Sequence, residues 1–324
     1  MSTFLAALHA LWSGSVGSWY ALTSSTLVRA VPLMLTGTAV AIAFRAGVFN
    51  IGAEGQLLAG AAAAAAAALA MPGGGAGTIV VALVAGVVGG AAWAGVAAML
   101  RTRFGVLEVI STIMLNYVAL YGVSWLVRGP LQEPTHAYPQ SLAIAATVHL
   151  PRIVGGGRLH LGLLLALAMV VVAGWVLRRT AAGFRVIAVG ESPRAAASAG
   201  LIRVTNTTAR AFLVSGGFAG LAGAIEVLGV TFALYEDLSP GYGYTAIAVA
   251  LVAGLDPWRV VASALVFAAL EAGAGAMQRD ANVPSTVVAI VEASIIIAVI
   301  GVQALRARTT SRGSRGGTAV LAEP

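Results

Sequence analysis

Long apolar stretches alternate with short polar stretches along this chain. A window of about 20 residues detects roughly nine candidate membrane spans. Because about 20 apolar residues in an α-helix cross the hydrocarbon core of a bilayer, each stretch predicts one transmembrane helix. The pattern therefore predicts an all-α polytopic membrane protein with about nine transmembrane helices, in a range of eight to ten. The predicted spans are residues 27–44, 55–71, 78–100, 106–127, 160–177, 209–230, 241–254, 258–277 and 284–304.

The composition agrees with this pattern, since 59% of the residues are hydrophobic and 10% are charged. All 19 basic residues are Arg, and without Lys the chain cannot form the phosphate-binding GxxxxGK[ST] loop of many ATPases. It has no Cys, and its four His residues lack metal-ligand spacing. We therefore expect no metal or cofactor bound by this chain. We also expect no nucleic acid polymer as a partner, because the net charge of +7 follows the membrane topology.

Arginines gather in two loops and in the C-terminal tail, and all three lie on one side if every predicted span crosses. The positive-inside rule makes that side the cytoplasm. The C-terminus is therefore predicted to be cytoplasmic. The predicted organisation is an outer interfacial segment or partial first helix at 1–26, a transmembrane domain at 27–305 with a cytoplasmic loop at 178–208, and a disordered cytoplasmic tail at 306–324.

A short helix is predicted inside the arginine-rich loop. Ser192 is a good N-cap, Pro193 suits the first helical position, and Gly200 is a natural stop. A helix of about seven residues is marginal by itself in water, so packing against the membrane body or a soluble partner would order it. Two readings stay open here: a docking helix for a partner, or an ordinary arginine-rich loop.

Polar residues inside the predicted spans are candidates for function. Asn116 lies mid-span, where an Asn most often forms interhelical hydrogen bonds. Glu226, Glu271 and Glu292 are intramembrane carboxylates, which are expected to face a neighbouring group or a watery cavity. Whether they line a path for a solute or only satisfy nearby polar groups stays open.

Small residues recur at a spacing of four in the segment that begins at Ser215. Gly216 and Gly220 share one helix face, as do Ala219 and Gly223. Such a face predicts close packing against another helix. The chain contains no GxSxG or HExxH motif, and none of its loops has paired carboxylates at helical spacing, so the chain is predicted not to be an enzyme.

The most unusual segment is FRAGVFNIGAEGQ, residues 44–56, which inserts polar and glycine residues between two apolar runs. A cluster of this kind is not needed for crossing a membrane. It is either an exposed turn or a buried functional element.

Several stretches together resemble a known family. ALHALWSGSVGSWYAL, TLVRAVPLMLTGTAVAIAFRAGVFNIGAEGQ, STIMLNYVALYGVSWLVRGPLQ, VGESPRAAASAGL and SGGFAGLAGAIEVLG, in this order, are similar to permease subunits of bacterial ABC importers in the branched-chain amino acid and ribose permease superfamily. The FNIGAEGQ element is most similar to the nucleoside (simple sugar/nucleoside) branch. Relatives commonly begin with an additional hydrophobic helix, which implies that a first helix is missing here or that the true start lies upstream.

The resemblance implies a type II ABC importer-like fold in the bacterial plasma (inner) membrane. It also implies a separate ABC ATPase subunit that uses ATP, a second permease subunit that forms a heterodimer, an external substrate-binding lipoprotein and surrounding membrane lipids. The implied solute is a nucleoside carried by alternating access. A ribose-like sugar is the alternative, and an ion-coupled secondary transporter is a more distant one.

The residue patterns and the resemblance together suggest roles for individual residues. The substrate pathway would include Phe49, Asn50, Glu54, Gln56, Asn116 and Glu226, with residues 44–56 as a re-entrant or interhelical element beside it. The region that couples to the ATPase would include Gly190, Glu191, Ser192, Pro193, Arg194, Ala197 and Gly200. Helix packing would use Gly216, Gly220 and Gly223.

Overall fold

The structure, a computed structural model, is built from helices, and no strand occurs among the residues it describes. These residues are 2–71, 73–200, 202–284, 286–291, 293–295, 297–298 and 301. The predicted tail at 306–324 and Glu292 lie outside them. The α-helices are α1 (Ser2–Ser15), α2 (Trp19–Ala21), α3 (Leu27–Arg45), α4 (Ala53–Ala70), α5 (Ala76–Phe104), α6 (Glu108–Arg128), α7 (Gly162–Arg179), α8 (Ala181–Glu191), α9 (Pro193–Ser198), α10 (Val204–Glu226), α11 (Tyr242–Val252) and α12 (Pro257–Ala281).

Seven helical stretches of the described chain are long and apolar enough to cross a membrane. Two shorter apolar helices, Tyr242–Val252 and Thr286–Ile295, fall where the remaining two spans were predicted. Each of the predicted apolar segments therefore coincides with a helix, and the all-α polytopic class is confirmed. The segment at 284–304 is described only in part.

The first long helix begins earlier than predicted. It runs from Trp19 to Arg45 and includes a π-helical turn at Leu22–Thr26, whereas the predicted span began at residue 27. Hydroxyl residues in this turn lower its hydropathy, but they are satisfied inside the protein: Thr23 Oγ1 donates to the Trp19 carbonyl at 2.7 Å, and Thr26 Oγ1 donates to the Ser15 carbonyl at 2.7 Å. Because these bonds replace water, the helix continues through residues that the hydropathy window excluded.

Helices α3 and α10 form the centre of the fold. In the 18-residue apolar segment of each membrane-spanning stretch, 83% of the stretch that contains α3 and 89% of the stretch that contains α10 is buried inside the protein. The corresponding share for α5 is 22%. Gly216 and Gly220 of α10 lie against Gly90 of α5, where a Cβ atom on either would overlap the Gly90 backbone. Gly223 lies equally close to the Leu57 carbonyl of α4. The small residues therefore let the backbones of α4, α5 and α10 touch.

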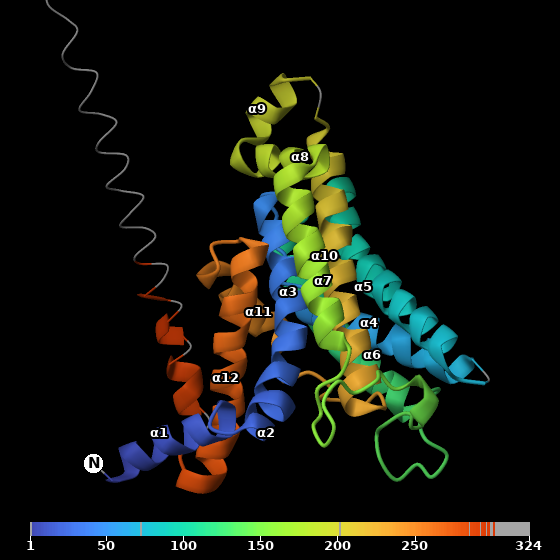
Figure 1. Cartoon of the computed structure of the whole chain (residues 1–324). Helices are drawn as coiled ribbons and strands as arrows, with labels where there is room; N and C mark the ends of the chain where they lie inside the picture. Colours follow the sequence, from blue (N-terminus) through green and yellow to red (C-terminus); the bar gives the residue numbers. More distant parts are fainter. Residues whose placement is uncertain are drawn as a thin grey trace, which may run out of the picture.

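The two ends of the bundle carry different elements (Figure 1). One end carries α8 and α9, and the other carries α1, α2 and the long connection between α6 and α7. This connection is tied to the segment after α10, because Ser141 N donates to the Leu234 carbonyl and Ile144 N donates to the Phe232 carbonyl, both at 2.8 Å. The bundle therefore has one projecting helical end and one end covered by connected loops.

Candidate functional site

The segment between α3 and α4 turns into the protein interior. Asn50 is fully buried, and its side chain donates to Gln56 Oε1 and to Ser215 Oγ, both at 2.9 Å. Its Oδ1 accepts from the Gly52 backbone N–H at 2.9 Å and from Gln56 Nε2 at 3.0 Å. Since Ser215 lies near the middle of α10, residues 46–52 descend as non-helical backbone between helices. Such backbone is tolerated in a membrane protein where the protein itself satisfies it.

Two helices begin beside this segment and face each other. The Glu54 carboxylate, in the first turn of α4, accepts from the Gly243 N–H in the first turn of α11 at 2.6 Å. A carboxylate is favoured there, because the N-terminal N–H groups of a helix lack partners and carry partial positive charge. Gly243 packs directly on the Glu54 backbone, so the two helix starts touch.

Asn116 of α6 closes the same network. Its Oδ1 accepts from the Gly55 N–H at 2.9 Å, and its Nδ2 donates to the Ile51 carbonyl at 3.0 Å and to the Tyr244 hydroxyl at 3.3 Å. The four predicted pathway residues Asn50, Glu54, Gln56 and Asn116 are thus brought together, and all are buried. Hydrogen bonds from these four side chains therefore connect α4, α6, α10 and α11 to one another.

Two other predicted pathway residues lie apart from this network. Phe49 is 55% exposed and meets the Phe44 ring edge-on, with the ring centroids 5.2 Å apart. Glu226 lies at the last turn of α10, where it lines a separate cavity. The structure therefore divides the predicted pathway set into a buried network, an exposed ring and a cavity-lining carboxylate.

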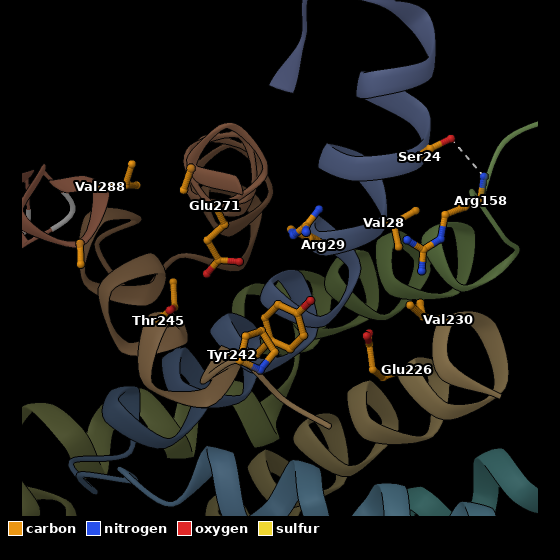
Figure 2. A pocket seen from close by; sticks show the side chains of 13 residues that line it. Ser24, Val28, Arg29, Arg158, Glu226, Val230, Tyr242, Thr245, Glu271 and Val288 are labelled. Carbon is orange, nitrogen blue, oxygen red and sulfur yellow. Dashed lines mark hydrogen bonds between the residues drawn. The ribbon is translucent and has the colours of Figure 1, made fainter. Parts of the chain in front are cut away.

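The cavity that contains Glu226 has a volume of about 520 Å³. Figure 2 shows Glu226, Glu271, Arg29 and Arg158 around it, with the ring of Tyr242 between the two acids. They come from α10, α12, α3 and the connection before α7, at the end of the bundle opposite α8 and α9. Two guanidinium groups and two carboxyl groups line the cavity together with the Tyr242 hydroxyl, so the lining offers hydrogen-bond donors and acceptors to a polar solute.

The sequence reasoning did not select the two cavity arginines. Arg29 lies within the first long apolar helix, where an arginine is costly unless it faces a cavity or a partner. That position alone was a usable signal. Arg158 carried no comparable signal, because it belongs to a connection whose path only the tertiary structure defines.

The predicted short helix is present as α9. Ser192 Oγ accepts from the Ala195 N–H at 3.3 Å, Pro193 occupies the first turn, and Gly200 follows the helix with φ of 71°. Only Ala196 of α9 is buried, so Arg194 and Ala197 are exposed, and Glu191 at the end of α8 is exposed as well.

The start of this region touches the segment between α3 and α4. Gly190, near the end of α8, lies so close to the Arg45 carbonyl and to Gly47 that any side chain at position 190 would overlap them. The exposed helix α9 is therefore connected, through α8, to the residues that lead into the buried network.

Glu236 and His160, which lie outside the membrane-spanning helices, have displaced pKa values. Hydrogen bonds from Arg128 and Ser124 lower the pKa of the Glu236 carboxyl to about 2. Burial, with a smaller contribution from Arg158, lowers the pKa of His160 to about 4, so its ring stays neutral. His160 Nδ1 accepts from the Gly162 N–H at 3.1 Å at the start of α7. Among the described residues, no group of three His, Cys, Asp or Glu side chains could hold a metal ion.

The fold and these features define a multi-pass, α-helical membrane permease. The family model described as "Branched-chain amino acid transport system / permease component" matches residues 22–301. The chain therefore belongs to this family.

Individual relatives are similar over most of their length. A glucose ABC transporter permease protein of Haloferax volcanii is 39% identical over 287 residues, which cover 86% of this chain and 75% of the relative. A guanosine ABC transporter permease protein of Bacillus subtilis is 38% identical over 301 residues, covering 92% and 86%. A nucleoside ABC transporter permease protein of Lactococcus lactis is 31% identical over 281 residues, covering 84% and 77%.

Proposed function

We propose that this chain is the permease subunit of an ATP-driven importer that carries nucleosides into the cytoplasm. The observation that carries the proposal is the similarity to permeases named for guanosine and for nucleosides over 92% and 84% of this chain. The cavity lined by Arg29, Arg158, Glu226 and Glu271 offers hydrogen-bonding groups to a nucleoside, which is polar and uncharged. The importer lies in the bacterial plasma membrane, with α8 and α9 on the cytoplasmic side.

The chain works with a separate ABC ATPase, a second permease subunit and an external lipoprotein that delivers the solute. Its lack of Lys excludes the usual phosphate-binding loop, so the ATPase belongs to another chain. The region from Gly190 to Gly200 is the ATPase contact, since α9 is exposed and projects from the bundle.

A movement of α9 can be transmitted to the solute path through a series of direct contacts. The close contact of Gly190 with Arg45 and Gly47 passes a displacement of α8 to the end of α3 and the segment that follows it. The Glu54 carboxylate then links α4 to the start of α11. ATP-driven closure of the ATPase would in this way move α4 and α11 together, which opens the path alternately to the two sides.

Replacement of Arg194 with Glu tests the coupling role. The exposed guanidinium of α9 is expected to contact the ATPase, so Arg194→Glu should abolish nucleoside-stimulated ATPase activity in the purified complex while the subunits still associate. Arg103→Glu is the matched control, because Arg103 is exposed at the same end of the bundle in the last turn of α5. Unchanged coupling in a stably assembled Arg194→Glu complex would refute the docking role.

A sugar is the second candidate solute, because the 39% identical relative is named for glucose. Uptake of radiolabelled guanosine and glucose, measured in proteoliposomes that contain the complete transporter and ATP, separates the two. Guanosine uptake that unlabelled adenosine competes for, and glucose does not, supports the nucleoside proposal. Uptake of glucose alone would replace it with the sugar importer.

A further inference from the structure

Helix α6 presents a row of aromatic side chains on its outer face. Tyr117, Tyr121 and Trp125 are 50%, 69% and 67% exposed. They follow one another at a spacing of four residues, so they lie on one face with a rise of about 6 Å between successive rings. We call these three residues the aromatic face of α6.

Two of these rings lie at the depth where a lipid-facing helix carries aliphatic side chains. The midpoint of Glu108–Arg128 falls between Tyr117 and Tyr121. Neither hydroxyl has a hydrogen-bond partner among the described residues. Tyrosine is enriched at the membrane interfaces, where its hydroxyl reaches water, and hydrocarbon offers no such partner at the membrane centre.

Helix α5 shows what a lipid-facing surface looks like in this protein. It is about as exposed as α6, with 22% of its apolar window buried against 28%. From Ala76 to Met99 its large exposed side chains are valines and one methionine, and the exposed Phe104 lies at its last residue. The exposed valines and methionine are Val80, Val81, Val84, Val88, Val96 and Met99. The aromatic face of α6 therefore differs from the lipid-facing surface in chemistry, not in exposure.

Polar groups border the aromatic face on both sides. Tyr244 of α11 is 45% exposed, and its hydroxyl accepts from Asn116, the residue next to Tyr117. At the far end of α6, Arg128 Nη2 donates to Glu236 Oε2 at 2.8 Å, and Ser124 donates to the same carboxylate. The half-exposed Tyr244 beside the rings and the exposed Arg128–Glu236 ion pair at the end of α6 thus surround this face with polar groups.

We propose that the aromatic face of α6, together with Tyr244, lines the solute path and stacks against the nucleobase of the transported nucleoside. This proposal rests on the proposed function, and it names the surface that recognises the base. Flat rings one helical turn apart offer successive stacking positions, and their hydroxyl groups supply hydrogen bonds to a neutral polar solute. Stacking tolerates any base, since every nucleobase has a π-face.

The arrangement also gives a role to the buried network. Asn116 holds Tyr244 by its hydroxyl and the start of α4 by the Gly55 N–H. Because Asn116 belongs to α6, these bonds tether Tyr244 and the start of α4 to α6 and fix where Tyr244 lies beside the rings. The network is in this way a positioning element for the stacking surface.

Photolabelling of the complete transporter tests the proposal without relying on transport. An azido-substituted guanosine is irradiated with the assembled complex in proteoliposomes, and the labelled peptides are identified by mass spectrometry. We expect adducts on the α6 peptide that unlabelled guanosine prevents. Adducts confined to other helices, with none on α6 or α11, would overturn the proposal.

Substitutions at Tyr121 test the stacking itself. Tyr121→Leu keeps an apolar side chain but removes the ring, and we expect the KM for guanosine to rise about tenfold, as loss of one base-stacking contact predicts. Tyr121→Phe keeps the ring and should stay within about threefold of the unmodified transporter. Trp175→Leu is the matched control, because Trp175 is an aromatic residue of α7 that is 58% exposed.

The outcomes separate this proposal from the proposed function. Guanosine uptake by the unmodified transporter, with equal KM values for Tyr121→Leu and Tyr121→Phe, would leave the nucleoside importer standing and overturn the stacking surface. Uptake of glucose but not of guanosine by the unmodified transporter would overturn both. A higher KM in Tyr121→Leu alone, with Trp175→Leu unchanged, supports the stacking surface.

Discussion

Helices α10 and α6 are nearly equal in hydropathy, yet the protein uses them in opposite ways. The stretches that contain them have mean hydropathies of 1.7 and 1.5, but 89% of the α10 window is buried against 28% of the α6 window. Side-chain size accounts for the difference. The buried face of α10 carries glycine and alanine, which allow backbones to touch, whereas the outer face of α6 carries tyrosine and tryptophan.

The comparison shows that hydropathy detects a span without revealing its neighbours. Lipid tails are as apolar as leucine, so a membrane helix gains little from burying a large apolar side chain. Small residues stabilise the packed helix because they allow close van der Waals contact between backbones. Large aromatic residues with polar tips are suited to a surface that meets water. Between α10 and α6, the size of the side chains on the facing surfaces therefore distinguishes the packed helix from the exposed one.

The largest expected effect comes from a substitution in the packed helix α10. Gly220→Leu should prevent correct folding, because the new side chain would overlap the backbones of Gly86 and Gly90, at a cost above about 4 kcal/mol. The matched control is Gly122→Leu in α6, where a Cβ atom meets nothing within 4 Å. The measurement is the yield of monodisperse complex in detergent. Equal yields for the two variants would contradict this account of α10.

A smaller effect is expected where α4 and α11 meet through a polar contact. Glu54→Ala leaves the Gly243 N–H without its acceptor, and a buried unsatisfied donor costs about 1–3 kcal/mol. Glu54→Gln retains an acceptor oxygen and should recover most of the loss. Thermal unfolding of the purified complex measures both variants. An unchanged melting temperature for Glu54→Ala would show that this contact does not stabilise the junction.

The smallest effect concerns the loop-covered end of the bundle. Burial lowers the pKa of His160 from 6.5 to about 4, so the unfolded chain binds a proton there more readily than the folded protein does. Stability should therefore fall as the pH drops from 6.5 towards 4, by about 1 kcal/mol between pH 7.5 and 5.5.

Thermal unfolding across this pH range measures the effect, and His160→Asn should flatten the pH dependence. His136→Asn serves as the control, because His136 is exposed in the connection between α6 and α7. Identical pH profiles for the two variants would exclude His160 as the source.

Much of the candidate site could be anticipated from particular residues. The capping signals at Ser192, Pro193 and Gly200 predicted α9, because capping depends on local backbone geometry alone. The polar segment at 44–56 was identified as an unusual element for the same local reason. The sequence left open whether this segment was an exposed turn or a buried element, and the structure shows Asn50, Glu54 and Gln56 as buried hydrogen-bonding groups. The sequence did not anticipate that Glu226 would line a different cavity.

The sequence by itself determined that this protein is a polytopic helical membrane protein, since apolar length and composition require each segment to satisfy its own backbone as a helix. The resemblance of its motifs to a known family indicated a permease. The sequence also located the glycine face of α10 and the short helix α9. Only the tertiary structure decided that α4 and α11 begin face to face across Glu54, that Arg29 and Arg158 join Glu226 around one cavity, and that the rings of α6 point outward. These are relations between helices, and they depend on packing between residues far apart in the chain, which no local pattern encodes.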